Sequence, residues 1–194
     1  MRGRSLILMG TMLVLGLIAA PAALAEGPGT GGVAYVEPAP DGAAPVNPEQ
    51  PTVPGAVAQI VDGLAHAPAA APDAVKQAIW AANKIVGLPY RYGGGHGRGF
   101  VDRGYDCSGT VSFALNGADM LESPLDSGSF ARWGQSGAGD WITVYANAGH
   151  AYAVIAGLRL DTSAAGDPSG AKGPRWRPVL RSPRGFRARH PAGY

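Results

Sequence analysis

The sequence predicts an α+β fold, because two helix-like stretches come first and several short strand-like runs follow. Residues 73–86 and 107–116 carry apolar side chains at helical spacing, and a glycine-rich stretch separates them. From residue 141 onward, β-branched and aromatic residues gather in short runs that are broken by turn residues. This segregation favours helices packed on a small antiparallel sheet over an alternating, parallel arrangement.

The first 25 residues have the pattern of a secretory signal peptide. Arg2 and Arg4 precede an apolar run from Leu6 to Ala20, and Ala23-Leu24-Ala25 supplies small residues for cleavage. The run is shorter than the ~20 apolar residues that a spanning helix needs, so an uncleaved anchor is the weaker alternative. We therefore expect an exported bacterial protein, secreted or held in the cell wall, without a stable membrane span after signal cleavage.

Residues 26–71 are dominated by Pro, Gly and Ala and contain few large apolar side chains. Such a segment buries too little surface to offset its chain entropy, which predicts a largely disordered linker. At most, one short helix is expected within residues 53–67. The composition changes at Pro72, and residues 72–194 are expected to form one domain of ordinary size.

The elements of this domain can be placed in order. Pro72 and Asp73 suit the start of the first helix, Gly87 suits its end, and Gly117 suits the end of the helix at 107–116. The first helix should bury one apolar stripe, formed by Val75, Ile79, Ala82 and Val86.

The second half should be mostly sheet. Residues 122–140 are expected to form a surface loop. Strands are expected at 141–146, 150–157 and 158–163, each antiparallel to the next, because Asn147-Ala148-Gly149 and Gly157 break the runs. The segments 174–180 and 184–191 would add edge structure.

Charge excludes some functions and leaves others open. The formal net charge is +2, but without Arg2 and Arg4 the chain has equal numbers of basic and acidic residues. Residues 172–190 hold seven Lys and Arg and no acid, which could contact an anionic cell-wall polymer. A solvated face balanced by acids elsewhere is the interpretation that we favour. No nucleic-acid-binding motif is present, so we expect no nucleic-acid partner.

Cys107 is the only cysteine. Exported proteins usually pair their cysteines, so a single one is either a reactive thiol or a small buried hydrophobe. Its place at the start of the predicted helix favours reactivity, because free N–H groups and the helix dipole there lower a thiol pKa. The same N–H groups can stabilise an oxyanion.

A thiolate nucleophile needs a base, and His150 is the best placed of the four histidines. It opens a predicted strand, whereas His66, His96 and His190 lie in the linker, the glycine loop and the terminus. Asp161, at the end of the next strand, is the candidate to orient its ring. Taken alone, a histidine in this position is more often a solvent-facing or capping residue, and Asp161 is more often a turn residue.

A metal site is a weak alternative. Cys107, His150 and Asp161 could ligate zinc, but neither C-x-x-C nor H-E-x-x-H spacing occurs. The glycines at 93–99 are not followed by a P-loop Lys-Ser/Thr. We therefore expect neither a metal nor another cofactor.

Three blocks in this order resemble the NlpC/P60 cysteine peptidases: "GLPYRYGG" (87–94), "YDCSG" (105–109) and "GHAYAVIAG" (149–157). The resemblance covers roughly residues 73–163. It implies a papain-like catalytic domain that cleaves amide bonds in peptidoglycan stem peptides, commonly between D-γ-glutamyl and a diamino acid. It also implies that Cys107 is the nucleophile, that His150 is the base, and that Tyr90, Asp106 and Ser108 bind substrate.

The sequence departs from the family pattern in three places. The third polar residue is usually a histidine, whereas Asp161 stands here; the glycine loop is longer; and the approach to His150 differs. An aspartate can orient a histidine and stabilise its cation, so a Cys-His-Asp triad is chemically sound. The alternatives are a catalytically degenerate, wall-associated binding protein and a related cysteine amidase or acyltransferase.

Overall fold

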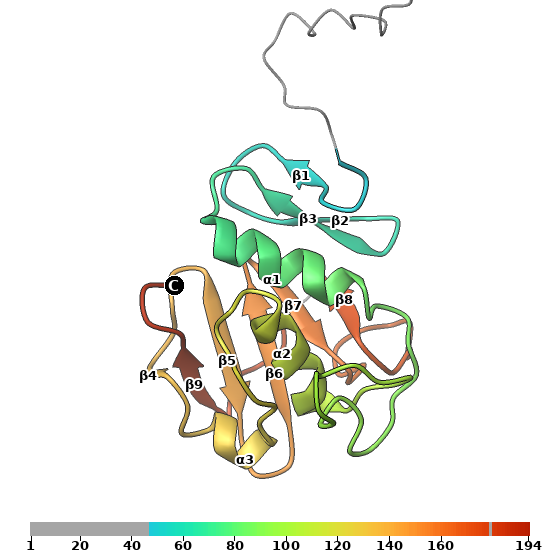
Figure 1. Cartoon of the computed structure of the whole chain (residues 1–194), viewed down its shortest axis with the longest axis vertical. Coiled ribbons are helices and arrows are strands. Elements are labelled where there is room, and N and C mark those ends of the chain that lie inside the picture. Colours follow the sequence, from blue (N-terminus) through green and yellow to red (C-terminus); the bar gives the residue numbers. More distant parts are fainter. Residues whose placement is uncertain (1–46, 179) are drawn as a thin grey trace, which may run out of the picture. The chain divides into compact units, whose positions relative to one another are not determined.

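The computed structural model describes residues 47–178 and 180–194. The expected signal peptide at 1–25 and the linker residues 26–46 lie outside the described residues. What is described combines three helices with two sheets, which confirms the α+β class (Figure 1).

Two helices form where the apolar pattern places them. α1 spans Asp73–Asn83 and follows Pro72, as the start signals predict. Val75, Ile79 and Ala82 of its predicted stripe are buried, and its last turn ends before Val86. α2 spans Cys107–Asn116, with the predicted bounds. The short α3 covers Ser127–Phe130.

The strands of the main sheet follow α2. They are β4 (Gln135–Ser136), β5 (Ile142–Ala146), β6 (Ala151–Ile155), β7 (Leu158–Asp161), β8 (Arg175–Arg177) and β9 (Arg187–His190). Their order in the sheet is β4-β9-β5-β6-β7-β8, and every neighbouring pair is antiparallel. The three consecutive strands expected after residue 141 are therefore confirmed.

Two expectations about the second half were wrong in detail. The region 122–140 is not only loop, because it contains α3 and β4. Of the two segments expected at the sheet edge, only β8 is an edge strand. β9 lies between β4 and β5, because the chain returns from β8 across the sheet before it pairs.

The two faces of the main sheet differ in chemistry. One face carries Val144, Ala153, Leu160 and Trp176, which belong to the buried hydrophobic core, and α2 packs against β6 and β7. Because side chains alternate along a strand, the neighbouring positions point to the opposite face. That face carries charged and aromatic residues, namely Tyr152, Arg159, Asp161 and Arg177.

The linker prediction was wrong for residues 47–71. They form β1 (Thr52–Val53), β2 (Gln59–Val61) and β3 (Leu64–Pro68), which make a three-stranded sheet in the order β1-β3-β2. The expected helix within 53–67 is absent. α1 lies between this small sheet and the main sheet (Figure 1). Small side chains are enough to pack this sheet on α1, because Ala65 and Ala67 are fully buried against the larger residues of the helix.

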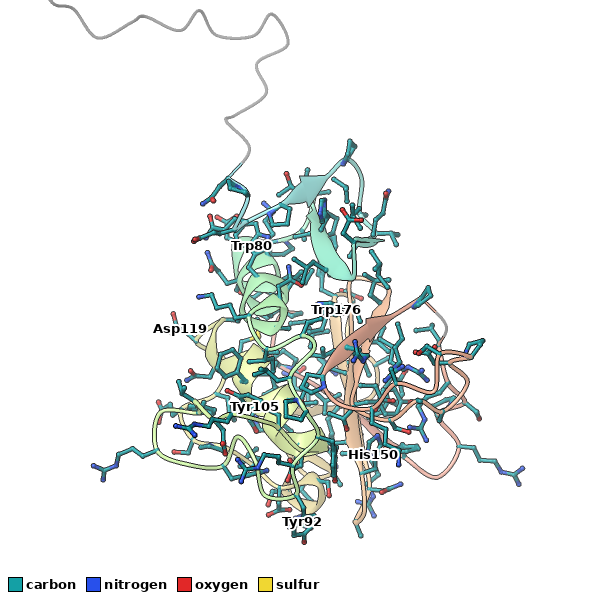
Figure 2. All side chains as sticks on the ribbon, turned by 90° about the vertical axis from the view of Figure 1, so that its right-hand side faces the viewer. Trp80, Tyr92, Tyr105, Asp119, His150 and Trp176 are labelled. Carbon is teal, nitrogen blue, oxygen red and sulfur yellow. The ribbon has the colours of Figure 1, made fainter. Side chains whose placement is uncertain are left out.

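Polar side chains of α1 join the two sheets. The Asn83 amide pairs with the backbone of Ala65 at 2.9 and 3.0 Å, as a neighbouring strand would. The same Asn83 accepts a hydrogen bond from the Trp176 indole of β8 at 2.7 Å. Trp80 donates to the Pro51 carbonyl at 3.1 Å, and both indoles are seen on either side of α1 in Figure 2.

Candidate active site

Cys107 occupies the first position of α2, where backbone N–H groups are free. Asp106 is the N-cap residue, with extended backbone, and its carboxylate accepts a hydrogen bond from the Gly109 N–H at 2.8 Å. The preceding glycine loop packs tightly on this helix end. A Cβ at Gly109 would collide with the Gly94 carbonyl, so only glycine allows the approach. The local sequence thereby presents a thiol at a rigid, electropositive helix end.

His150 reaches this thiol from the sheet. It immediately precedes β6, and Asn147 fixes the turn before it by accepting hydrogen bonds from the N–H groups of Gly149 and His150 at 2.9 and 3.0 Å. The imidazole and the backbone N–H of Ala151 lie close enough to the half-buried Cys107 to stabilise its thiolate, which lowers the pKa of the thiol. Figure 2 shows His150 on the strand side of this region and Tyr105 on the loop side.

Asp161 is hydrogen-bonded to the imidazole of His150. Its Oδ1 lies 2.9 Å from Nε2 of His150, which leaves the other ring nitrogen, Nδ1, for Cys107. The β6–β7 hairpin brings the two residues together, because its register, continued by one pair, places Tyr152 opposite Asp161. His150 then sits two residues before Tyr152 on the same face of the sheet.

The pKa values of the pair shift in opposite directions. Burial raises the pKa of Cys107, but the hydrogen bonds from His150 and Ala151 and the charge of His150 outweigh it, so the pKa is lowered. Burial lowers the pKa of His150, but hydrogen bonds to Asp161 and Cys107 and their negative charges raise it to about 9. Both shifts favour the thiolate–imidazolium form, in which the sulfur is nucleophilic.

Cations surround the fully buried carboxylate of Asp161. Arg181 donates to its Oδ2 at 3.2 Å, and the Arg159 Nε lies 3.7 Å from the same oxygen. Burial raises the pKa of Asp161, but hydrogen bonds from His150 and the Ser163 N–H, with the charges of His150 and Arg159, lower it overall. The carboxylate is therefore held ionised beside the imidazole.

The favoured interpretation of the basic segment 172–190 holds for Lys172, Arg184 and Arg187, which are exposed, but not for Arg177. Arg177 is not solvated: it is fully buried and bonds the Asp167 carboxylate and the Ala171 carbonyl. Arg181 lies against the rings of Tyr152 and Phe186, at 5.2 and 5.1 Å from their centroids. The acids that balance these cations come from β7 and the loop after it, so the pairs form inside the fold.

One polar residue near the thiol, His96, is not predicted from the sequence, because a glycine loop is expected to hold an imidazole poorly. However, its Nε2 lies 3.0 Å from Oδ1 of Asp106 and 3.2 Å from Oγ of Ser108. The Gly93 N–H also donates to Asp106, at 2.9 Å. In the sequence, the only hint of this contact is that Asp106 and Ser108 follow His96 by about ten residues.

A cleft of about 500 Å³ opens beside the sulfur. Tyr90, Asp106, Cys107 and Ser108 line it together with His96, Asp126 and the backbone before His150. The structure thus places Tyr90, Asp106, Cys107 and Ser108 at one cleft, whereas His150 and Asp161 lie outside its lining. Asp106 also acts as a helix cap, against the expectation that it serves substrate alone, and both it and Ser108 are largely buried. Their contact with substrate stays a prediction.

Tyr90 stands at the rim of the cleft with 44% of its surface exposed. Its backbone pairs with that of Tyr105, which ties the loop to the segment before α2. Burial, followed by the negative charges of Cys107 and Asp106, raises the pKa of its phenol. The group therefore stays protonated and can donate a hydrogen bond toward the cleft.

Two negative findings concern the part of the chain that the structure describes. No helix within it combines the length and the hydropathy of a membrane span. No group of three or more His, Cys, Asp or Glu within it is arranged to hold a metal ion.

Comparisons with known proteins add one structural likeness. No family model matches the chain, and no curated protein matches it. A search of solved structures finds similarity to a hypothetical invasion protein of Mycobacterium tuberculosis, at 21% identity and a TM-score of 0.43. The match covers 60% of this chain and 62% of that one, so the chain spans less than two thirds of that structure's length.

Proposed function

We propose that this protein is an exported cysteine peptidase that hydrolyses amide bonds in peptidoglycan stem peptides. The observation that carries the proposal is the hydrogen bond between His150 and the buried Asp161, with the Cys107 thiol next to the same imidazole and beside an open cleft. A nucleophile, a base and an orienting carboxylate in this order are what covalent amide hydrolysis requires.

The chemistry follows from the positions of these groups. The Cys107 thiolate attacks the amide carbonyl, and the carbonyl oxygen takes up negative charge near the free N–H groups of α2. His150, held protonated, gives its proton to the leaving nitrogen, so the C–N bond breaks and a thioester remains. The neutral imidazole then takes a proton from water, which attacks the thioester and releases the acid and the thiolate.

The substrate class rests on the resemblance of the three motif blocks to the NlpC/P60 peptidases. On that basis the scissile bond joins D-γ-glutamyl to a diamino acid. The bond between His150 and Asp161 favours a working enzyme over a degenerate wall-binding protein, because an aspartate here fills the role of the missing third histidine. Export and wall localisation rest on the amino-terminal pattern.

The test uses purified stem peptides and mass spectrometry of the products. The wild type should cleave them, and Cys107→Ala should not, while its circular dichroism and melting temperature stay close to those of the wild type. Hydrolysis in ¹⁸O-labelled water should place one label in the acyl product, which separates a hydrolase from an acyltransferase. Undiminished cleavage by Cys107→Ala would exclude the proposed mechanism, and binding without cleavage by the wild type would favour the wall-binding alternative.

A further inference from the structure

Two hollows flank the Cys107–His150 pair and share Tyr90 as a wall. The cleft described above is lined by Cys107 and not by His150. A second hollow, of about 270 Å³, is lined by His150 and not by Cys107. Its other lining residues are Thr162, Ser163, Ala164 and Lys172.

The chemistry assigns one side of the substrate to each hollow, if the protein is the peptidase proposed above. The acyl carbon becomes bonded to the Cys107 sulfur, so the acyl part extends into the larger cleft. The departing nitrogen must lie near His150, which protonates it. The amine product therefore occupies the hollow lined by Lys172.

The second hollow is positively charged. Lys172 is its only cation besides His150, and no Asp or Glu lines it. Among the described residues, Lys172 has no ion-pair partner, whereas the buried Arg177 and the nearby Arg181 are both paired with carboxylates. An ammonium group beside a proton donor, without an acid to neutralise it, favours an anionic group in the bound molecule.

The backbone on both sides of Lys172 is held in place. The preceding Ala171 carbonyl accepts a hydrogen bond from the buried Arg177 guanidinium at 2.7 Å. The following Gly173 donates its N–H to the Thr162 carbonyl at 3.0 Å and packs against the Leu88 carbonyl. Because both neighbours are fixed, the Lys172 side chain extends toward the hollow from a defined backbone position.

We propose that Lys172 is a specificity-determining residue that binds a carboxylate on the amine side of the scissile bond. The preferred leaving group would be an amino acid with a free carboxylate, either its own α-carboxylate or one at the end of its side chain. This inference rests on the proposed function, because that function decides which hollow receives the amine product.

The experiment compares three stem-peptide fragments with the same acyl side, L-Ala-γ-D-Glu. The leaving residue is lysine with a free α-carboxylate, lysine α-carboxamide, or diaminopimelate α-carboxamide, which keeps only the distal carboxylate. The wild type should cleave at least one carboxylate peptide up to about fivefold more efficiently (kcat/KM) than lysine α-carboxamide, which is the factor that an exposed ion pair contributes. The preferred peptide identifies which carboxylate is bound.

Three variants define the role of Lys172. Lys172→Met should reduce the preference to near one, and Lys172→Arg should keep most of it. Lys84→Met should leave it unchanged, because Lys84 is an exposed lysine that caps α1 and does not line the hollow. The preference should also shrink as the salt concentration rises, because Lys172 is exposed and its charge is screened by ions. Melting temperatures of all variants identify any that fail to fold.

Binding measurements separate this inference from the proposed function. Calorimetry of the same peptides in the Cys107→Ala background measures carboxylate binding without turnover. If the wild type cleaves no peptide but carboxylate binding depends on Lys172, the carboxylate subsite is supported and the peptidase activity is refuted. If all three peptides are cleaved and bound equally, with and without Lys172, the subsite is overturned while the peptidase stands.

Discussion

Replacing Asp161 with asparagine should lower the pKa of His150 while keeping the shape of the site. The amide oxygen of asparagine can still accept from Nε2 of His150, now 2.9 Å from the carboxylate, so mainly the negative charge is lost. The wild-type pKa is raised from 6.5 to about 9, and Asp161 contributes both a hydrogen bond and a charge to that shift.

The size of the effect follows from this shift. A displacement of about 2.5 pH units corresponds to about 3 kcal/mol in favour of the imidazolium. Cys107 supplies part of it, so Asp161→Asn should lower the pKa of His150 by at least about one unit, or ~1.4 kcal/mol. The imidazolium would then be lost nearer pH 7.5 than pH 9, which removes the acid that protonates the leaving nitrogen.

The assay is a pH titration of the histidine ring signals by NMR, with His150 assigned from a His150→Ala sample. Asp126→Asn is the matched control, because Asp126 is a carboxylate that lines the same cleft and caps α3 without contacting His150. The same titration followed by kcat/KM should show the basic limb moving to lower pH in Asp161→Asn only. If the His150 pKa changes no more in Asp161→Asn than in Asp126→Asn, the account of Asp161 is wrong.

Three further predictions concern residues around the site. Gly109→Ala should lower the free energy of unfolding by about 1–3 kcal/mol, measured by urea denaturation, because its Cβ would collide with the Gly94 carbonyl; equal stability would contradict the close packing. Arg181→Met should lower kcat more than it raises KM, because it frees the Asp161 carboxylate that orients His150; an effect on KM alone would argue against this positioning role. Trp176→Phe should cost about 1 kcal/mol in thermal or urea unfolding, since the indole hydrogen bond to Asn83 is lost; a neutral substitution would mean that water replaces it without cost.

Much of the site could be predicted because its determinants are local. The start of α2 is defined by about a dozen residues. Asp106 caps the helix, and apolar side chains at helical spacing follow Cys107. The relation between His150 and Asp161 comes from one hairpin, since two short antiparallel strands joined by a tight turn bring nearby residues to the same face.

The errors share a different cause, which is contact between distant segments. Residues 47–71 have too few large side chains to fold alone, and they form a sheet only because α1 offers a surface on which alanines can be buried. His96 was dismissed as part of a flexible loop, yet Asp106 and Ser108 give its ring two polar neighbours. Neither partner can be inferred from the composition of the loop.

By itself, the sequence determined the α+β class, the bounds of α2, the order of β5 to β7 and the identity of Cys107, His150 and Asp161 as a group. Tertiary structure alone decided that Arg177 is buried, that Arg181 supports Asp161 and that Lys172 lies unpaired beside His150. The physical reason is that periodicity and turn chemistry act over a few residues. The environment of a charge, in contrast, depends on which distant carboxylates the folded chain brings within reach.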